Sequence, residues 1–250
     1  MKSITLIGSG NVATHLASVL QNNYNIKQIF SRNINNAKEL SEKVNAEAIN
    51  ELNKINPVDL IIVCLSDNII EDIINHIPKS NIVHTAGSIS IDIFKERFDN
   101  YGVIYPLQSF RKNLEIDLKQ TPICVEANNK SFEKKMINFA NSFSNNVISM
   151  TSKTRKEVHL AAVFACNFTN HMFVIADQIL NNSDIKFEIL LPIIKQNINN
   201  IKYNKPINIQ TGPAKRKDKN IISEHLAQLS ELDTKNIYKI ISQHISKTHD

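Results

Sequence analysis

The sequence predicts an α/β protein: a doubly wound domain with a parallel sheet at the N-terminus, followed by an all-helical domain at the C-terminus. Residues 2–150 alternate short β-branched runs with helical patterns, which is typical of a parallel sheet covered by helices. No strand-type pattern of any length returns after residue 150. We therefore predict a first domain at residues 1–152 and a helical domain at residues 153–250.

Six apolar runs are expected to be strands, because a strand that is buried on both faces is continuously apolar rather than alternating. Patterns with helical periodicity lie between several of these runs, so their order predicts right-handed crossovers. The expected strands are residues 3–7, 26–30, 59–65, 81–85, 102–105 and 121–125, and the expected helices are residues 12–21, 35–44, 68–76 and 131–143.

The second domain is expected to begin with a long helix at residues 155–180, a run without Pro or Gly that ends in a polar stretch. Further helices are expected at residues 185–201, with a kink at Pro192, and at residues 220–229 and 234–246. A long apolar helix at the start of such a domain is typical of packing against another domain or another subunit. We therefore expect a homodimer.

The composition is that of an ordinary globular chain. Its 250 residues, 42% hydrophobic and 21% charged, can bury a core without disulfides or metals. The net charge of +5 comes without the aromatic interleaving of a nucleic-acid-binding surface. We expect no apolar stretch of membrane-spanning length and no signal peptide, which predicts a cytoplasmic protein. Cys64, Cys124 and Cys166 lie in apolar surroundings without metal-ligand spacing, so we expect three buried thiols and no metal site.

The first predicted strand runs directly into the sequence GSGNVA at residues 8–13, and a helical pattern follows. This G-x-G-x-x-A pattern, with a strand before it and a helix after it, is the dinucleotide-binding signature of a Rossmann domain. Gly8 permits the tight turn, Gly10 lets the backbone approach a pyrophosphate, and Ala13 keeps the helix close to the sheet. The N–H groups at the helix start favour phosphates. The alternative is a glycine turn that binds nothing.

Ser31 and Arg32 stand about 20 residues after the glycines, where NAD-binding proteins carry an acidic residue for the ribose 2′-hydroxyl. A hydroxyl and a guanidinium suit a 2′-phosphate instead, so we predict NADP as the cofactor. A solvated loop charge is the alternative for Arg32. Strand ends at the same sheet edge extend the prediction, and the expected cofactor-binding residues are Gly8, Ser9, Gly10, Asn11, Val12, Ser31, Arg32, Leu65, Ser66, Asp67, Thr85, Ala86 and Gly87.

Several polar residues are candidates for catalysis. His159 is the best titratable candidate for a proton donor, and Asn167 lies close to its face of the long predicted helix. His84 is near the carboxyl end of a predicted strand, and Gln108 follows the fifth strand, where it can reach a substrate or the nicotinamide amide. A structural hydrogen-bond network explains the helical residues equally well, and a rigid turn explains the loop around Gln108.

Four motifs together resemble a known family: residues 8–13, HTAGS at 84–88, YPLQSF at 105–110 and TGPAKRKD at 211–218. They are similar to the Rossmann-like family with the DUF2520 C-terminal domain, described as NADP oxidoreductases. That family is related in architecture to pyrroline-5-carboxylate reductase, ketopantoate reductase and the 6-phosphogluconate dehydrogenase superfamily. The resemblance covers nearly the whole chain. It implies an NADP-binding domain, a helical dimerising domain and an active cleft between them, and it adds Arg216 and Asp218 as site residues.

The chain departs from the pattern of its expected relatives. The related hydroxyacid dehydrogenases place a lysine on the long interdomain helix and an asparagine one turn later. Asn167 and Asn170 retain the asparagine, whereas Val163 and Cys166 stand four residues earlier, and neither replaces an ammonium group. Members of the DUF2520 family also often carry His where Tyr105 stands. These differences argue against simple alcohol dehydrogenation.

The sequence therefore predicts an NADP-dependent oxidoreductase that reduces a small carbonyl or imine compound. An imine reductase similar to pyrroline-5-carboxylate reductase is a second enzymatic hypothesis, although the chain lacks the Gly/Ser/Thr-rich loop expected there. The missing lysine supports a hypothesis of a different class, an NADP-binding sensor or scaffold dimer without turnover.

Overall fold

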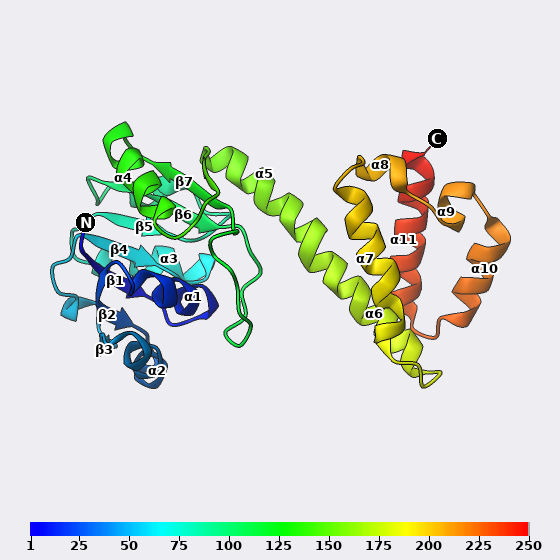
Figure 1. Cartoon of the computed structure of the whole chain (residues 1–250), viewed down its shortest axis with the longest axis horizontal. Helices are drawn as coiled ribbons and strands as arrows, with labels where there is room; N and C mark the ends of the chain where they lie inside the picture. Colours follow the sequence, from blue (N-terminus) through cyan, green and yellow to red (C-terminus); the bar gives the residue numbers. More distant parts are fainter. Residues whose placement is uncertain (250) are drawn as a thin grey trace. The chain divides into compact units, whose positions relative to one another are not determined.

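The computed structural model describes residues 1–249 and divides the chain into two compact units (Figure 1). The first unit is Met1–Cys166, and the second begins at Asn167. The predicted boundary after residue 152 falls at the start of helix α5 (Ser152–Ala162), which belongs to the first unit. Arg155 of this helix is fully buried, which explains why α5 belongs with the sheet.

The first unit is built on an eight-stranded sheet with the strand order β3-β2-β1-β4-β5-β6-β7-β8. The order of its first six strands is that of a Rossmann fold. The predicted fold class, an N-terminal Rossmann domain with a helical C-terminal part, is therefore confirmed. The strands are β1 (Ser3–Ile7), β2 (Asn25–Phe30), β3 (Glu47–Ile49), β4 (Leu60–Val63), β5 (Ile82–His84), β6 (Tyr101–Pro106), β7 (Ile123–Ala127) and β8 (Val147–Ser149).

Strand β7 is the exception in the predicted parallel sheet, because β7 pairs with β6 in the antiparallel direction. Parallel neighbours need a crossover connection, usually a helix, and residues 107–122 contain neither helix nor strand. The chain therefore turns back on itself and places Cys124 opposite Tyr105. Strands β3 and β8 are additions to the prediction, since each spans three residues and carries little apolar pattern.

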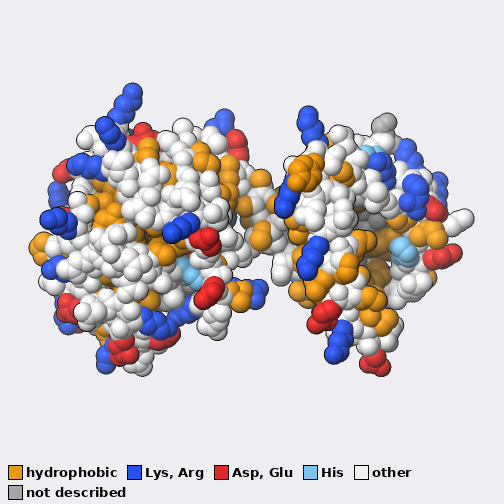
Figure 2. Space-filling view, in the orientation of Figure 1, with side chains coloured by type: hydrophobic (Ala, Val, Ile, Leu, Met, Phe, Trp, Pro, Cys, Tyr) orange, Lys and Arg blue, Asp and Glu red, His pale blue; other side chains and the backbone are white. Residues whose placement is uncertain are grey.

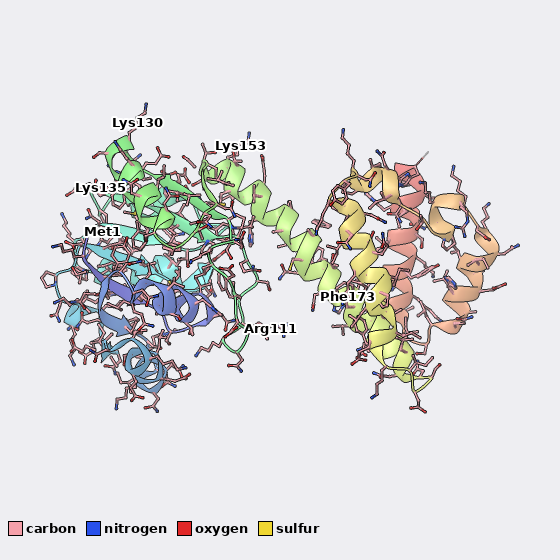
Figure 3. All side chains as sticks on the ribbon, in the orientation of Figure 1. Met1, Arg111, Lys130, Lys135, Lys153 and Phe173 are labelled. Carbon is pink, nitrogen blue, oxygen red and sulfur yellow. The ribbon has the colours of Figure 1, made fainter. Side chains whose placement is uncertain are left out.

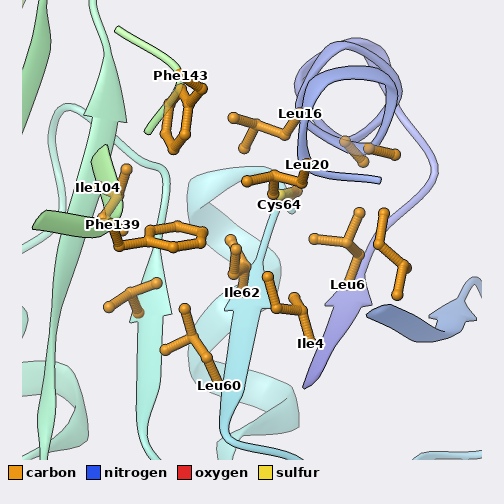
Figure 4. Packing of buried hydrophobic residues seen from close by; sticks show 14 of the residues in the cluster. Ile4, Leu6, Leu16, Leu20, Leu60, Ile62, Cys64, Ile104, Phe139 and Phe143 are labelled. Carbon is orange, nitrogen blue, oxygen red and sulfur yellow. The ribbon is translucent and has the colours of Figure 1, made fainter. Parts of the chain in front are cut away.

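Helices cover both faces of the sheet. On one face, α1 (Asn11–Leu20), α2 (Ile34–Val44) and α4 (Lys130–Asn141) pack on a buried apolar cluster. Figure 4 shows part of it, with Leu16 and Leu20 of α1 and Phe139 of α4 over the sheet. On the other face, α3 (Asp67–Ile73) and two 3₁₀ turns at Ile74–His76 and Ile91–Phe94 cover a second cluster. The Rossmann unit thus has three layers.

The second unit is helical, as predicted. Pro192 stands in the first turn of its helix, where the missing N–H costs nothing, so the helix starts there and the predicted kink is wrong. After α6 (Thr169–Asn181) come a 3₁₀ turn (Phe187–Leu190), α7 (Leu191–Ile201), α8 (Pro206–Ile209), α9 (Pro213–Arg216), α10 (Lys219–Gln228) and α11 (Leu232–Thr248).

The long predicted helix is present as one continuous run, Ser152–Asn181. It consists of α5, a π-helical segment at Val163–Phe168, and α6. An 18-residue window of this run has a mean hydropathy of 1.4 and is 0% buried. By length and composition alone, it is the one helix among the described residues that could cross a membrane. The expectation that the chain has no apolar stretch of membrane-spanning length is therefore wrong. One such helix is weak evidence, because core helices of soluble proteins pass the same test.

The second unit buries almost nothing by itself. Within residues 167–249, Ala214 is the one side chain classed as buried. Figure 2 shows apolar side chains at the surface of this unit. The side chains of Ile189, Ile193 and Ile240 are 63% to 68% exposed. Cys64 and Cys124 are buried as predicted, whereas Cys166 is exposed, because the helix around it has no covering layer.

Candidate active site

The first glycine turn lies at the carboxyl ends of β1 and β4. Gly8 has a φ of +122°, and a Cβ atom there would lie 2.3 Å from the backbone oxygen of Cys64. Only glycine combines this conformation with so close an approach of two strands. Gly10 differs, because a Cβ atom at Gly10 would meet no protein atom within 4 Å. The space beside Gly10 is therefore open to a ligand.

The N-terminus of α1 is available for an anion. Gly10 is the N-cap residue, no side chain caps the helix, and no acidic residue stands in its first turn. The Asn11 side chain points to the loop after β6 instead, where it accepts a hydrogen bond from the Lys112 backbone N–H at 3.2 Å. The helix N–H groups and the dipole therefore face the open space beside Gly10 without a protein partner for their charge.

A pocket of about 330 Å³ extends from this turn across the end of β2. Its walls include Asn36 of α2 and two apolar side chains of α3, Ile69 and Ile73, none of which the sequence prediction contains. The sequence does not show which face of the short helix α3 turns toward the pocket, so Ile69 and Ile73 could not be predicted as pocket residues. Seven of the predicted cofactor-binding residues line the pocket: Gly8, Ser9, Gly10, Ser31, Arg32, Leu65 and Ser66. Arg32 is exposed at its rim.

Of the six other predicted cofactor residues, Asn11 and Val12 begin α1, Asp67 begins α3, and three lie at the next strand end. Thr85, Ala86 and Gly87 are buried in the loop after β5. A Cβ atom at Gly87 would lie 2.7 Å from Nδ1 of His159 and 2.9 Å from Cζ of Tyr105. Gly87 therefore makes room for two rings from other elements. Asp67 at the start of α3 is exposed and accepts a hydrogen bond from the Ser88 hydroxyl.

Tyr105 and His159 form a pair over Gly87. The Tyr105 hydroxyl lies 2.9 Å from Nδ1 of His159, and the ring planes meet edge to face at 76°. Tyr105 is the last residue but one of β6 and is 9% exposed, whereas His159 in α5 is half-buried. Burial raises the pKa of Tyr105 to about 12, and the nearby Cys124 and Asp67 act in the same direction against Arg155. The hydroxyl is therefore protonated at neutral pH.

Helix α5 is held to the sheet by Arg155, whose side chain is 0% exposed. Its guanidinium forms an ion pair with Glu126 of β7 and donates a hydrogen bond to the backbone oxygen of Ile89. Ser152 donates to the same Glu126 carboxylate at 2.7 Å. Residues four apart share a helix face, so this anchor fixes the position of His159. Figure 3 shows Lys153, at the start of the same helix, pointing away from the unit.

Two family models match the chain. The model described as "Domain of unknown function (DUF2520)" matches residues 121–245, and the model described as "NADP oxidoreductase coenzyme F420-dependent" matches residues 3–94. The crystal structure of a proposed NADP oxidoreductase from Bacteroides fragilis is 37% identical, covers 98% of each chain and has a TM-score of 0.92. The chain belongs to the DUF2520 family of NADP oxidoreductases. The predicted resemblance and the family's cofactor, NADP, are thereby confirmed.

More distant structures share the fold of this DUF2520 protein. A protein from Thermotoga maritima is 23% identical over 98% of both chains, with a TM-score of 0.71. A reductive aminase from Aspergillus terreus, solved with NADPH and ethyl levulinate, is 14% identical over 100% of this chain and 96% of its own, with a TM-score of 0.72. No curated protein matches the sequence.

Two candidate catalytic residues of the DUF2520 protein lie in contrasting environments. His84 is 0% exposed, and its Nδ1 accepts the Ala86 backbone N–H at 3.1 Å. Burial, helped by the positive charge of Arg155, lowers the pKa of His84 to about 3. This imidazole is neutral and enclosed, which suits a structural role in the loop before Gly87. Gln108 is exposed, and its side-chain oxygen accepts the Ser109 backbone N–H at 2.8 Å.

The other three candidates belong to the second unit. Asn167 lies in the π-helical segment, a rare geometry that often marks functional positions. Arg216 is exposed at the end of α9, and Asp218 caps α10 by accepting the Ile221 backbone N–H at 3.2 Å. Capping accounts for Asp218 without a ligand. Among the described residues, no cluster of His, Cys, Asp and Glu could hold a metal ion.

The sequence analysis missed Tyr105 and Arg155 as residues of this site. Tyr105 and His159 are 54 positions apart, with two strands and two helix starts between them, so no local pattern signals their pairing. A weak signal existed in the five glycines of the chain, since a scarce glycine at a strand end often marks a close approach. Gly87 is such a glycine, and its neighbours are the two rings.

Proposed function

We propose that this protein is a cytoplasmic, NADP-dependent reductase of a small carbonyl or imine compound. One observation supports the proposal most strongly. The protonated Tyr105 hydroxyl and the His159 imidazole lie at the same sheet edge as the pocket beside Gly10, which we call the dinucleotide cradle. Bound NADPH supplies a hydride, so the protein needs to bind the cofactor, orient the substrate and deliver one proton. The uncapped start of α1 and the space beside Gly10 serve the first need.

Imines are the favoured half of this substrate class. The fold is shared with the reductive aminase from Aspergillus terreus and with an imine reductase from Pseudomonas, which is 17% identical over 80% of this chain and 75% of its own, with a TM-score of 0.61. The exposed Asp67 carboxylate accepts a hydrogen bond from Ser88, next to Gly87, and a negative group there favours a neutral imine over an anionic keto acid.

A substrate panel tests the proposed function. Purified protein and NADPH are mixed with cyclic imines, ketone and amine pairs, aldehydes and keto acids, and the nicotinamide absorbance is followed. We expect oxidation of NADPH with at least one imine or carbonyl compound. Tight NADPH binding without oxidation by any member of the panel would contradict the reductase and favour the sensor or scaffold.

The preference for NADP depends in this proposal on Arg32, at the rim of the pocket near the end of β2. Replacing Arg32 with alanine should remove a charge-assisted contact to the 2′-phosphate and reduce NADPH affinity roughly ten- to a hundredfold, with NADH affinity unchanged. Calorimetric titration of both coenzymes measures the ratio. The matched control is Lys38→Ala on the exposed side of α2, and an unchanged ratio in Arg32→Ala would exclude the contact.

We infer that the helical unit is covered by a second copy of this chain. A unit of this length with Ala214 as its one buried side chain lacks a core of its own. A pocket of about 250 Å³ between α6, α9 and α11, lined in part by Ile175, Ile237 and Ile241, adds to the apolar surface available for a partner. A bilayer is a poor alternative, because Asn167 and other polar side chains stand midway along the apolar helix.

Light scattering after size-exclusion chromatography tests the homodimer. We expect twice the chain mass of 28.3 kDa over the whole accessible concentration range. A constant mass of one chain, without aggregation, would contradict a second copy as the covering partner.

A further inference from the structure

We propose that Tyr105 is the catalytic proton donor of the reduction and that His159 is the positioning residue that orients its hydroxyl and restores its proton. This inference rests on the proposed reductase function and assigns the proton step to a particular pair of residues. Both residues lie within the first unit, as do Gly87 and the cradle, so the pair and the cofactor site are parts of one compact body.

The two rings have little freedom to separate. Tyr105 lies within the central strand β6, which pairs with β5 on one side and β7 on the other. His159 is fixed from the other direction by Arg155, one helical turn earlier, whose charge is bound to Glu126. A Cβ atom at Gly87 would lie 2.7 Å from Nδ1 of His159 and 2.9 Å from Cζ of Tyr105. Both rings therefore pack directly on the backbone of the loop after β5. A donor held in this way loses little entropy when it reacts.

The hydrogen-bond partners define the direction of proton transfer. A neutral imidazole carries one hydrogen. If Nδ1 carries it, Nδ1 donates to the Tyr105 oxygen at 2.9 Å, and the hydroxyl hydrogen is free to point at a substrate. Nε2 is then an acceptor, and because His159 is only half-buried, solvent can supply the next proton. The opposite tautomer would engage the hydroxyl hydrogen with His159 instead.

The charges around Tyr105 favour a donor over a base. The groups that face it are Cys124 on β7, Asp67 on α3 and Arg155 on α5. Arg155 is neutralised by Glu126, and burial outweighs its effect, so the raised pKa of Tyr105 keeps the phenol protonated. A weak acid of this kind gives up its proton only as negative charge develops on the substrate heteroatom.

The proposed step balances in atoms and charge. The substrate carbon receives a hydride with its electron pair from NADPH, and the π electrons of the C=N or C=O bond move to the heteroatom. The heteroatom takes the proton of the Tyr105 hydroxyl. The phenolate oxygen takes the Nδ1 proton of His159 while Nε2 takes one from solvent, so the pair ends neutral. The net change is one hydride and one proton added to the substrate.

The other polar groups at this edge are less suited to the step. Asp67 is exposed, and its carboxylate already accepts a hydrogen bond from Ser88. Arg155 is fully buried and bound to Glu126 and to the Ile89 carbonyl. His84 is enclosed and stays neutral at neutral pH. The Tyr105 hydroxyl is thus the group in this part of the described structure that is both protonated and paired with a proton source.

The experiment removes the hydroxyl and keeps the ring, in Tyr105→Phe. With a substrate found by the panel, we expect kcat to fall by about 10²- to 10⁴-fold, with NADPH affinity unchanged. Tyr101→Phe, the same substitution on the same strand, is the matched control and should retain kcat within about twofold. For His159→Gln we expect a smaller loss in kcat, an unchanged KM and the loss of one limb of the pH–rate profile.

Nitrogen NMR of the histidine ring gives a readout that needs no turnover. His159 should show the Nδ1-protonated tautomer in the unmodified protein, and its signals should shift in Tyr105→Phe but not in Tyr101→Phe. Near-normal kcat in Tyr105→Phe, with an active unmodified enzyme, would overturn the assignment of Tyr105 and leave the reductase intact. No NADPH oxidation by the unmodified protein would overturn both proposals.

Discussion

Replacing Gly10 with alanine should reduce the affinity for NADPH by about a hundredfold or more, while the protein remains folded. The backbone at Gly10 has φ −81° and ψ −169°, which an alanine adopts, and the new Cβ atom would meet no protein atom within 4 Å. The cost at the N-cap of α1 is about 1 kcal/mol or less. The methyl group instead occupies the space through which the pyrophosphate approaches the backbone. Calorimetric titration with NADPH and thermal unfolding measure the two effects separately.

The matched variant at the other glycine should behave in the opposite way. In Gly8→Ala the Cβ atom would lie 2.3 Å from the Cys64 oxygen, at a φ of +122° that alanine avoids. We expect a loss of stability of at least ~1–3 kcal/mol from the backbone conformation alone, before the clash is counted. If Gly10→Ala binds NADPH as tightly as the unmodified protein, the cofactor does not pass over this turn.

Replacing Arg155 with methionine should destabilise the Rossmann unit by about 3–5 kcal/mol, which for a chain of this size lowers the melting temperature by roughly 10 °C. The methionine fills much of the volume, but it leaves the Glu126 carboxylate, 16% exposed, without its counter-charge. The Ile89 carbonyl also loses its donor. Thermal unfolding of the full chain measures the change.

Lys153→Met in the first turn of the same helix is the control, since Lys153 is exposed and its loss should change stability little. The double variant Arg155→Met with Glu126→Gln should recover part of the loss, because no uncompensated charge remains. A melting temperature within about 2 °C of the unmodified protein in Arg155→Met would show that the ion pair does not anchor α5.

Local signals in the sequence predicted those parts of the molecule that depend on neighbouring residues. The strand, the glycine turn and the helix at residues 3–20 are contiguous, so their order and their open phosphate-facing side follow from residue types alone. Ser31 and Arg32 were found in the same way, from a fixed spacing after the glycines, and both line the pocket. The doubly wound fold class followed from the alternation of strands and helices.

The rest depends on contacts between distant segments. The direction of β7 was missed because it does not depend on the residues of the strand itself. It follows from the connection between β6 and β7, which contains no crossover helix. The partnership of Tyr105 with His159 and the burial of Arg155 depend on where α5 lies against the sheet. Cys166 was expected to be buried because its neighbours are apolar, yet an apolar helix is covered only if another layer reaches it.

The two margins of the sheet affect how the protein meets other chains. The outermost strands, β3 and β8, are three residues each, so they offer few free N–H and C=O groups to a foreign strand. Short margins are one of the ways in which natural sheets avoid edge-to-edge aggregation. The Rossmann half is thus protected against self-assembly through its sheet edges.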